Sequence, residues 1–427
     1  MGNIFYKNVY TVWMDIMKEY IFWLKILLFL AMLATPLRIV GKGYPVLYML
    51  LALAMPMFIA LITSYCLVNK RIIINNSYQI IVYFMAVFIW MTIGSTNGYS
   101  VIGETSSLCL MMLSLIAIVV SYNEKLISAE YIKNLAYLIM YCWSGAYALV
   151  ALGMIFDIIP SDIFMNLIQI WLEANPNTAM DSGFLGLIPR LGSGENILPL
   201  IIYAYYLVDK RAGSICVWLM MFMFVLVDYG RIDMFFFVFL TMMFIYFKLK
   251  KRKISLQKSI MLITSLLAVI IFAYAFFAVN NINGEEFLYG WTERYGREST
   301  ERYIQVKYLT EYITDRLWIG YGLGGYIPEY TRNVTVWLYE MEFHAFLMQM
   351  GIIGFMFIIV NYLVLFLRMV FVDINKRYKF ITVACFLYWI VDSTFQGEVY
   401  FGVGRMICTV MFIFSRKERT VDISRCG

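Results

Sequence analysis

The chain has 427 residues, of which 62% are apolar and only 15% are charged, with a formal net charge of +6. A soluble protein carries roughly 25% charged residues, so the composition excludes a soluble protein and indicates a chain embedded in a bilayer. Membrane helices take about 20 residues each, which leaves too little chain for a separate large soluble domain. We therefore expect a single transmembrane domain over residues 1–427, with no nucleic-acid partner.

The seven cysteines form no recognisable disulfide framework. Six of them lie inside apolar runs and Cys426 stands alone near the C-terminus, without the CxxC spacing of a metal site. We expect neither a metal nor another cofactor. The first 20 or so residues lack the short apolar core and small-residue cleavage site of a signal peptide, so the first apolar run should remain as a membrane anchor.

Apolar runs of near-spanning length predict an all-α, polytopic membrane protein with about twelve transmembrane helices. The runs lie at about 21–40, 46–68, 78–95, 105–121, 132–156, 196–208, 213–228, 232–247, 259–279, 343–367, 379–396 and 399–414. Those at 196–208, 213–228 and 232–247 are short and closely spaced, so their ends are the least well defined.

Lysine and arginine predict the orientation of these spans. Basic clusters at 248–258, 376–379 and 416–419 mark cytoplasmic segments, and with twelve spans all three fall on one side together with both termini. The basic residues left on the other side are mostly arginine: Arg38, Arg190, Arg231, Arg294, Arg297, Arg302, Arg316, Arg332 and Arg405. Arginine grips carboxylate or phosphate through two hydrogen bonds. A salt bridge to a nearby acidic residue explains any single one of these arginines about as well. For the nine arginines together we expect an anionic ligand.

Two long loops are predicted on this arginine-rich side, at about 157–195 and 280–342. Long loops on a membrane scaffold are often functional. The first contains a short interfacial helix over 161–173. The second contains a helix at about 300–317 with Ser299 as a plausible N-cap. Its predicted apolar stripe consists of Tyr303, Val306, Leu309, Ile313 and Leu317.

A glycine-rich turn at 320–326 follows that helix. It includes Gly322 and Gly324 but lacks the Lys-Ser/Thr that follows a nucleotide-binding loop. We interpret it as a turn that lets the backbone approach a ligand closely. His344, the single histidine of the chain, stands where the loop enters the next span. A lone histidine is usually structural, but at this boundary it is also a candidate general base.

Two acidic residues are candidate partners of the cations. Glu342 could orient His344, although an i, i+2 pair shares a helix face only if the helix begins after Glu342. Arg405 is the most deeply placed cation of a predicted span, with Asp392 as its expected partner. A structural ion pair between these two helices is at least as probable as a functional one.

Four motifs resemble the O-antigen polymerase and O-antigen ligase superfamily. Residues 190–196 (RLGSGEN), which lead into a span, resemble the family's arginine-glycine-asparagine motif, and Tyr229-Gly-Arg231 resembles its serine-arginine turn with Gly230 in place of serine. Residues 299–324 resemble the large-loop pattern of arginine, helix and glycine turn. Residues 344–354 resemble its histidine followed by a glycine-x-x-glycine helix, except that Ala345 replaces a polar residue.

This resemblance implies a GT-C-like glycosyltransferase of bacterial lipopolysaccharide or polysaccharide biosynthesis, in the inner membrane with its active site facing the periplasm. Donor and acceptor would be oligosaccharides linked to undecaprenyl diphosphate, and a chain-length regulator and a flippase would be candidate partners. It also assigns roles to particular residues. His344, Arg302, Arg231 and Arg190 would be catalytic, and Arg294, Arg297, Arg316, Glu342, Asn196, Gly322 and Gly324 would contact substrate.

The expected reaction transfers the growing glycan from its diphosphate to a sugar hydroxyl of the next repeat unit. Arginine would replace the metal that stabilises the departing diphosphate, and inversion at the anomeric carbon would follow from His344 acting as base. A ligase that passes glycan to lipid A-core shares these motifs and is the nearest alternative. A flippase or transporter is the alternative from a different class.

Overall fold

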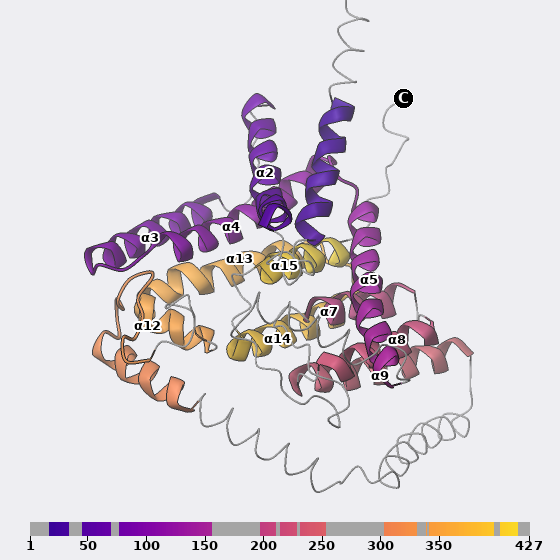
Figure 1. Ribbon diagram of the computed structural model, residues 1–427. Coiled ribbons are helices and arrows are strands. Elements are labelled where there is room, and N and C mark those ends of the chain that lie inside the picture. The colour runs from indigo at the N-terminus through magenta and orange to yellow at the C-terminus, as the bar shows by residue number, and fades with distance from the viewer. Residues whose placement is uncertain are drawn as a thin grey trace, which may run out of the picture.

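The computed structural model describes residues 17–33, 45–69, 77–155, 197–210, 214–228, 231–252, 303–330, 339, 341–396 and 402–416 (Figure 1). Within these ranges the chain consists of helices joined by turns. The only β-type pairing among the described residues is an isolated antiparallel bridge between Ile374 and Arg416. The prediction of an all-α protein is therefore confirmed for the part of the chain that the structure describes.

The helices follow the predicted apolar runs. They comprise residues 17–33, α2 (Pro45–Asn69), α3 (Ser77–Thr96), α4 (Ile102–Asn123), α5 (Ala129–Ile155), α7 (Ile197–Asp209), α8 (Ile215–Asp228), α9 (Arg231–Arg252), residues 303–315, α12 (Glu342–Phe355), the π-helix η3 (Met356–Val360), α13 (Asn361–Phe371), α14 (Lys379–Gln396) and α15 (Gly402–Ser415). Every predicted run overlaps one of these helices except 259–279, which lies outside the described residues.

Four described segments are long and apolar enough to cross a membrane: Met49–Val68, Ser77–Thr96, Ile102–Asn123 and Glu342–Phe371. Shorter apolar helices include Ile197–Asp209, whose 13 residues extend about 20 Å at 1.5 Å per residue, less than the ~30 Å of a bilayer core. The chain is thus a membrane protein by the length and composition of its helices. Its twelve-span topology and the sides of its termini stay predictions.

Helix α7 lies at the centre of one part of the bundle. All its residues from Ile197 to Val208 are buried, because α5, α9, α14 and α15 all pack against it. By contrast, α3 exposes large apolar side chains such as Met85, Phe88 and Ile89, as expected for a helix that faces lipid. The short helix α7 is therefore enclosed by protein, whereas the longer α3 presents an apolar surface.

The segment from α12 to α13 is interrupted. Gly351 has φ 62° and ψ −177°, which is not helical, and the π-helix η3 follows a few residues later. A break inside an apolar span leaves peptide groups without helical partners, and in a bilayer these groups must be satisfied by protein. Residues 317–322 supply these partners.

Candidate functional site

The glycine-rich turn docks into the break of α12. Backbone hydrogen bonds join the two segments in both directions, so the turn supplies partners to both halves of the interrupted helix. The amides of Tyr321 and Gly322 donate to the carbonyl oxygens of Met348 (3.1 Å) and Gln349 (2.7 Å), and the amides of Ile352 and Ile353 donate to those of Leu317 (2.9 Å) and Trp318 (3.1 Å). The loop and the span thus form one hydrogen-bonded unit.

Glycine is required where the turn meets its neighbours. Gly322 has φ +90°, and a Cβ atom built on it would lie 2.1 Å from the amide nitrogen of Gly94 in α3. A Cβ atom on Gly324 would lie 2.5 Å from the carbonyl oxygen of Ser100. The close approach predicted for this turn is therefore an approach to other backbone segments of the protein. Contact of Gly322 or Gly324 with a substrate stays a prediction.

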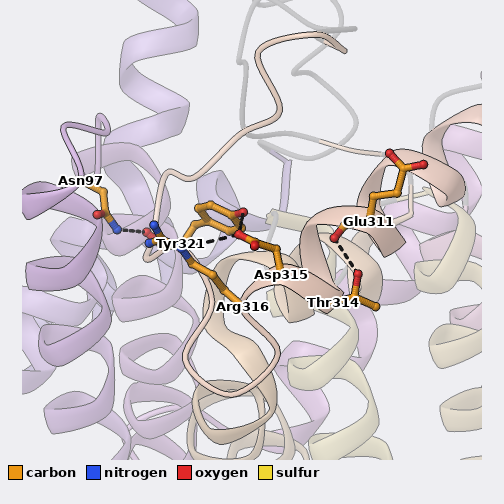
Figure 2. A network of polar contacts seen from close by, with 6 residues as sticks. All are labelled: Asn97, Glu311, Thr314, Asp315, Arg316 and Tyr321. Carbon is orange, nitrogen blue, oxygen red and sulfur yellow. Dashed lines mark hydrogen bonds and ion pairs between the residues drawn. The ribbon is translucent and has the colours of Figure 1, made fainter.

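Helix α3 holds the other side of the turn. The indole nitrogen of Trp90 donates to the carbonyl oxygen of Ile319 (2.7 Å), and the Trp90 carbonyl oxygen accepts from the amide of Leu323 (3.1 Å). The side-chain amide of Asn97 donates to the carbonyl oxygen of Tyr321 (2.7 Å; Figure 2). The turn is therefore clamped between α3 and α12.

Glu104 of α4 is a polar anchor that the sequence analysis missed. Its side chain is fully buried, and its Oε2 atom accepts a hydrogen bond from the amide of Gly324 (2.5 Å). The Oε1 atom has no hydrogen-bond partner in the structure. A carboxyl group next to the apolar run at 105–121 is itself a signal, because ionisable residues in membrane spans are rare and often functional.

Arg316 lies at the surface of this assembly. Its guanidinium group sits over the ring of Tyr321, 4.6 Å from the centroid, and its Nε atom is 3.9 Å from Oδ2 of Asp315. The side chain is 48% exposed, and no described residue forms a hydrogen bond with its terminal nitrogens. Figure 2 shows Arg316 lying beside Tyr321. A flat, oriented and solvent-accessible guanidinium group is suited to binding an anion.

Two tyrosine–carboxylate pairs surround this arginine. The hydroxyl of Tyr321 donates to Asp315 (2.6 Å) and that of Tyr312 donates to Glu329 (2.7 Å). Partial burial and the bond to Asp315 raise the pKa of Tyr321. The hydrogen bond to Glu329 raises the pKa of Tyr312 to about 12, and the same bond lowers the pKa of Glu329. The carboxylate of Glu329 is therefore held in the ionised form.

His344 lies in the first turn of α12. Its side chain is partly buried, and its Nδ1 atom is buried without a hydrogen-bond partner in the structure. Helix α12 begins at Glu342, so Glu342 and His344 are both helical and point about 200° apart around the axis. Glu342 is buried, but this geometry does not support a direct role for it in orienting His344.

The loop helix over 303–315 packs against the same end of α12. Leu309 is buried in a cluster with Ala345 and Met348, and Val306 packs against them. The ends of the predicted stripe are wrong, because the side chains of Tyr303 and Leu317 are 71% and 39% exposed. The described helix also ends at 315 rather than at about 317. The packing nevertheless brings the helix that precedes Arg316 onto the turn that carries His344.

Several predicted site residues belong to parts of the chain that the structure does not describe. Arg190, Asn196, Arg294, Arg297 and Arg302 lie outside the described residues, as does the predicted helix at 161–173. Arg231 is the first residue of α9, as predicted. Among the described residues, no group of three or more histidine, cysteine or acidic side chains could hold a metal ion.

Asp392 and Arg405, the predicted pair, lie in two neighbouring helices. Asp392 is buried in α14 and Arg405 is partly buried in α15, and these two helices pack together. An ion pair between the two side chains therefore stays a prediction.

Comparison with known proteins gives no match: no protein-family model, curated protein or solved structure matches the chain. The site must therefore be interpreted from its own chemistry.

Proposed function

We propose that this chain is a membrane glycosyltransferase of the O-antigen polymerase type. It would transfer a growing glycan from undecaprenyl diphosphate to a sugar hydroxyl of the next lipid-linked repeat unit, without a metal, at the periplasmic face of a bacterial inner membrane. The resemblance of its four motifs to that superfamily supports this proposal. The arrangement of Arg316 and His344 supports the chemistry.

The chemistry requires a cation and a base. His344 would accept the proton of the acceptor hydroxyl, whose oxygen attacks the anomeric carbon while the diphosphate leaves with the electrons of the broken C–O bond. The departing diphosphate gains negative charge, which oriented cations stabilise most effectively. Arg316 would be one such cation, together with Arg190, Arg231 and Arg302. Attack from the side opposite the leaving group inverts the anomeric carbon.

One observation carries this proposal. The turn that follows Arg316 is hydrogen-bonded to the helix that carries His344, so an exposed guanidinium group and an unpartnered imidazole nitrogen belong to one unit. Catalytic groups must be held in fixed relative positions to act together. A purely structural histidine would normally have its buried nitrogen hydrogen-bonded.

A transporter is the second candidate, because interrupted helices such as α12 often form binding sites in transporters. In those proteins the exposed peptide groups of the break coordinate substrate or ions. Here, four such groups are already bonded to residues 317–322, which leaves fewer of them for cargo. This arrangement favours the enzyme. A ligase would share the site and differ in its acceptor.

The test uses purified protein and radiolabelled lipid-linked repeat units. We expect glycan elongation without added divalent cation, and a loss of about 10²- to 10⁴-fold in rate for His344→Ala. Arg316→Lys keeps the charge but not the planar group, and should reduce the rate about tenfold or more. Arg368→Lys on the exposed surface of α13 is the matched control and should leave the rate unchanged.

Other outcomes would contradict the proposal in different ways. Transfer only to lipid A-core indicates a ligase, and movement of the lipid across a vesicle bilayer without elongation indicates a transporter. Full activity of His344→Ala, or a strict requirement for a divalent cation, would contradict the proposed mechanism.

A further inference from the structure

Half-buried tyrosines gather around Arg316. The rings of Tyr312 and Tyr321 lie 5.4 Å apart between centroids, and those of Tyr99 and Tyr326 lie 5.8 Å apart. Tyr99 is close enough to Arg316 for that charge to act on its phenol. We call these four residues, with Asp315, Arg316 and Glu329, the tyrosine cluster. None of the four tyrosines is fully buried, so their rings reach the surface beside the candidate site.

The two carboxylates of the cluster are oriented hydrogen-bond acceptors. Asp315 and Glu329 each accept one tyrosine hydroxyl through a single oxygen, Oδ2 and Oε2 respectively. The Oδ1 atom of Asp315 has no hydrogen-bond partner within the described residues, whereas Glu329 also accepts a hydrogen bond from its own backbone amide. Both side chains are exposed. Each carboxylate is thus fixed by a tyrosine, and Oδ1 of Asp315 stays available to a ligand.

This combination suits a sugar ring. A pyranose presents apolar C–H faces, which pack on amphipathic aromatic rings such as tyrosine, and a rim of hydroxyls, which donate to oriented carboxylates. We propose that the tyrosine cluster is a carbohydrate subsite for an uncharged sugar of the glycan, with Tyr312 and Tyr321 as the stacking surface. The inference rests on the proposed function, since it adds a sugar-binding surface beside the same site.

The charges of the surface determine which sugars it accepts. Glu311, Asp315 and Glu329 are acidic and exposed within 19 residues of chain, and Arg316 is the one basic residue of that stretch. A uronic acid would bring its own carboxylate beside Asp315 and Glu329, and like charges at short range repel. Neutral and N-acetylated sugars avoid this repulsion, so the cluster should select against acidic glycans.

The experiment uses the full-length protein in nanodiscs, perdeuterated except for its tyrosines. Saturation of the tyrosine ring protons is transferred to a bound sugar and is detected by NMR. The probes are a panel of neutral, N-acetylated and uronic-acid tetrasaccharides. Tyr312→Phe with Tyr321→Phe keeps both rings but replaces their protons with deuterium, and should reduce the transferred signal several-fold. Tyr303→Phe, at an exposed position of the same helix, should leave it unchanged.

A second pair of variants tests the charge selection. Asp315→Asn with Glu329→Gln should bring the affinity for the uronic-acid probe about tenfold closer to that for its neutral counterpart. Glu311→Gln, which removes a carboxylate that holds no tyrosine, should change this ratio much less. Glu311 lies well away from Tyr321 in Figure 2.

The subsite is wrong if no probe gives a signal, if uronic-acid probes bind best, or if Tyr303→Phe has the same effect as the double variant. These outcomes are separate from the test of the proposed function. Binding without elongation by the wild type would contradict the enzyme and retain the subsite, whereas elongation that is insensitive to both double variants would contradict the subsite alone.

Discussion

Two groups of residues in this protein pair tyrosine with a carboxylate, and they differ in how many tyrosine hydroxyls each carboxylate accepts. In the first, Asp209 at the end of α7 accepts the hydroxyl of Tyr137 through Oδ2 (2.8 Å) and that of Tyr378 through Oδ1. Arg377 closes this group by donating to the carbonyl oxygen of Asp209 (2.7 Å). In the tyrosine cluster, by contrast, Asp315 and Glu329 each hold one tyrosine.

The difference separates a structural group from a binding surface. Asp209 uses both carboxylate oxygens to connect α7 with α5 and with the residue before α14, and Tyr137 and Tyr378 are both buried. Nothing in that arrangement is left for a ligand. Asp315 and Glu329 each hold one tyrosine and are exposed. The same two residue types therefore stabilise the fold at one place and offer acceptors at the other.

The largest effect should come from the turn beneath the tyrosine cluster. Gly322→Ala places a Cβ atom 2.1 Å from the Gly94 amide nitrogen at a φ of +90°. Overpacking and left-handed strain together should cost about 3 kcal/mol or more. Hydrogen exchange should show loss of protection in residues 317–325, while the Asp209 group keeps its protection.

Gly98→Ala is the matched control, because Gly98 also has a positive φ (+82°) but has nothing within 4 Å of its built Cβ atom. It should cost only about 1 kcal/mol, from the conformation alone. Equal effects of the two substitutions would show that close packing of the turn is unimportant.

A smaller loss of stability should follow from removing the carboxylate of Asp209, which accepts two tyrosine hydroxyls. Asp209→Ala leaves the buried hydroxyls of Tyr137 and Tyr378 without their acceptor. Hydrogen bonds to charged groups are each worth about 1.5–3 kcal/mol, so unfolding in mixed micelles should become easier by about 3 kcal/mol. Asp315→Ala removes one exposed hydrogen bond and should change stability by less than about 1 kcal/mol. A reversed order would contradict our distinction between the two groups.

The smallest effect concerns pH. The pKa of Glu329 is lowered because the hydroxyl of Tyr312 donates to its ionised form. The stabilisation is therefore present above the usual pKa of glutamate and is lost as the pH falls through the lowered value. The pKa of Tyr312 is raised to about 12, so its contribution is present below its usual value of 10.0 and is lost as the pH rises through about 12.

Tyr312→Phe should return the pKa of Glu329 toward its usual value, which a ¹³C NMR titration of the labelled carboxyl would measure. The matched variant Tyr308→Phe removes a nearby hydroxyl that holds no carboxylate in the described residues, and should leave the titration unchanged. An unchanged titration in Tyr312→Phe would mean that this bond does not fix the carboxylate.

Hydropathy predicted the helices well because lipid and protein interiors both select apolar side chains over the length of a span. Runs such as 46–68 and 105–121 closely match α2 and α4. The apolar stripe of the loop helix was less successful at its ends. Tyr303 is exposed, and the polar Gln305 is buried because its side-chain oxygen accepts the amide of Met341 (2.9 Å). Periodicity cannot anticipate such a long-range partner.

The candidate site was only partly predictable, because residue type marks some of its members but does not reveal their long-range contacts. The sequence predicts Arg316 and His344 as site residues because one is a cation in a long loop and the other is a titratable side chain where that loop enters a span. The break at Gly351 does not, because it exists only when residues 317–322 supply hydrogen-bond partners from a distant part of the chain. Trp90 likewise reads as an ordinary apolar residue of α3, and its bond to Ile319 depends on that same docking.

The interruption of α12 also limits which parts of the site can move. Withdrawal of the turn would leave four peptide groups unpaired inside an apolar bundle, and each unmade bond costs roughly 1–3 kcal/mol. The turn therefore holds the two helix segments together through these hydrogen bonds. We expect it to stay docked and not to open and close. In the proposed glycosyltransferase, access for a lipid-linked substrate would have to come from movement of other segments, while Arg316 and the start of α12 keep their relative positions.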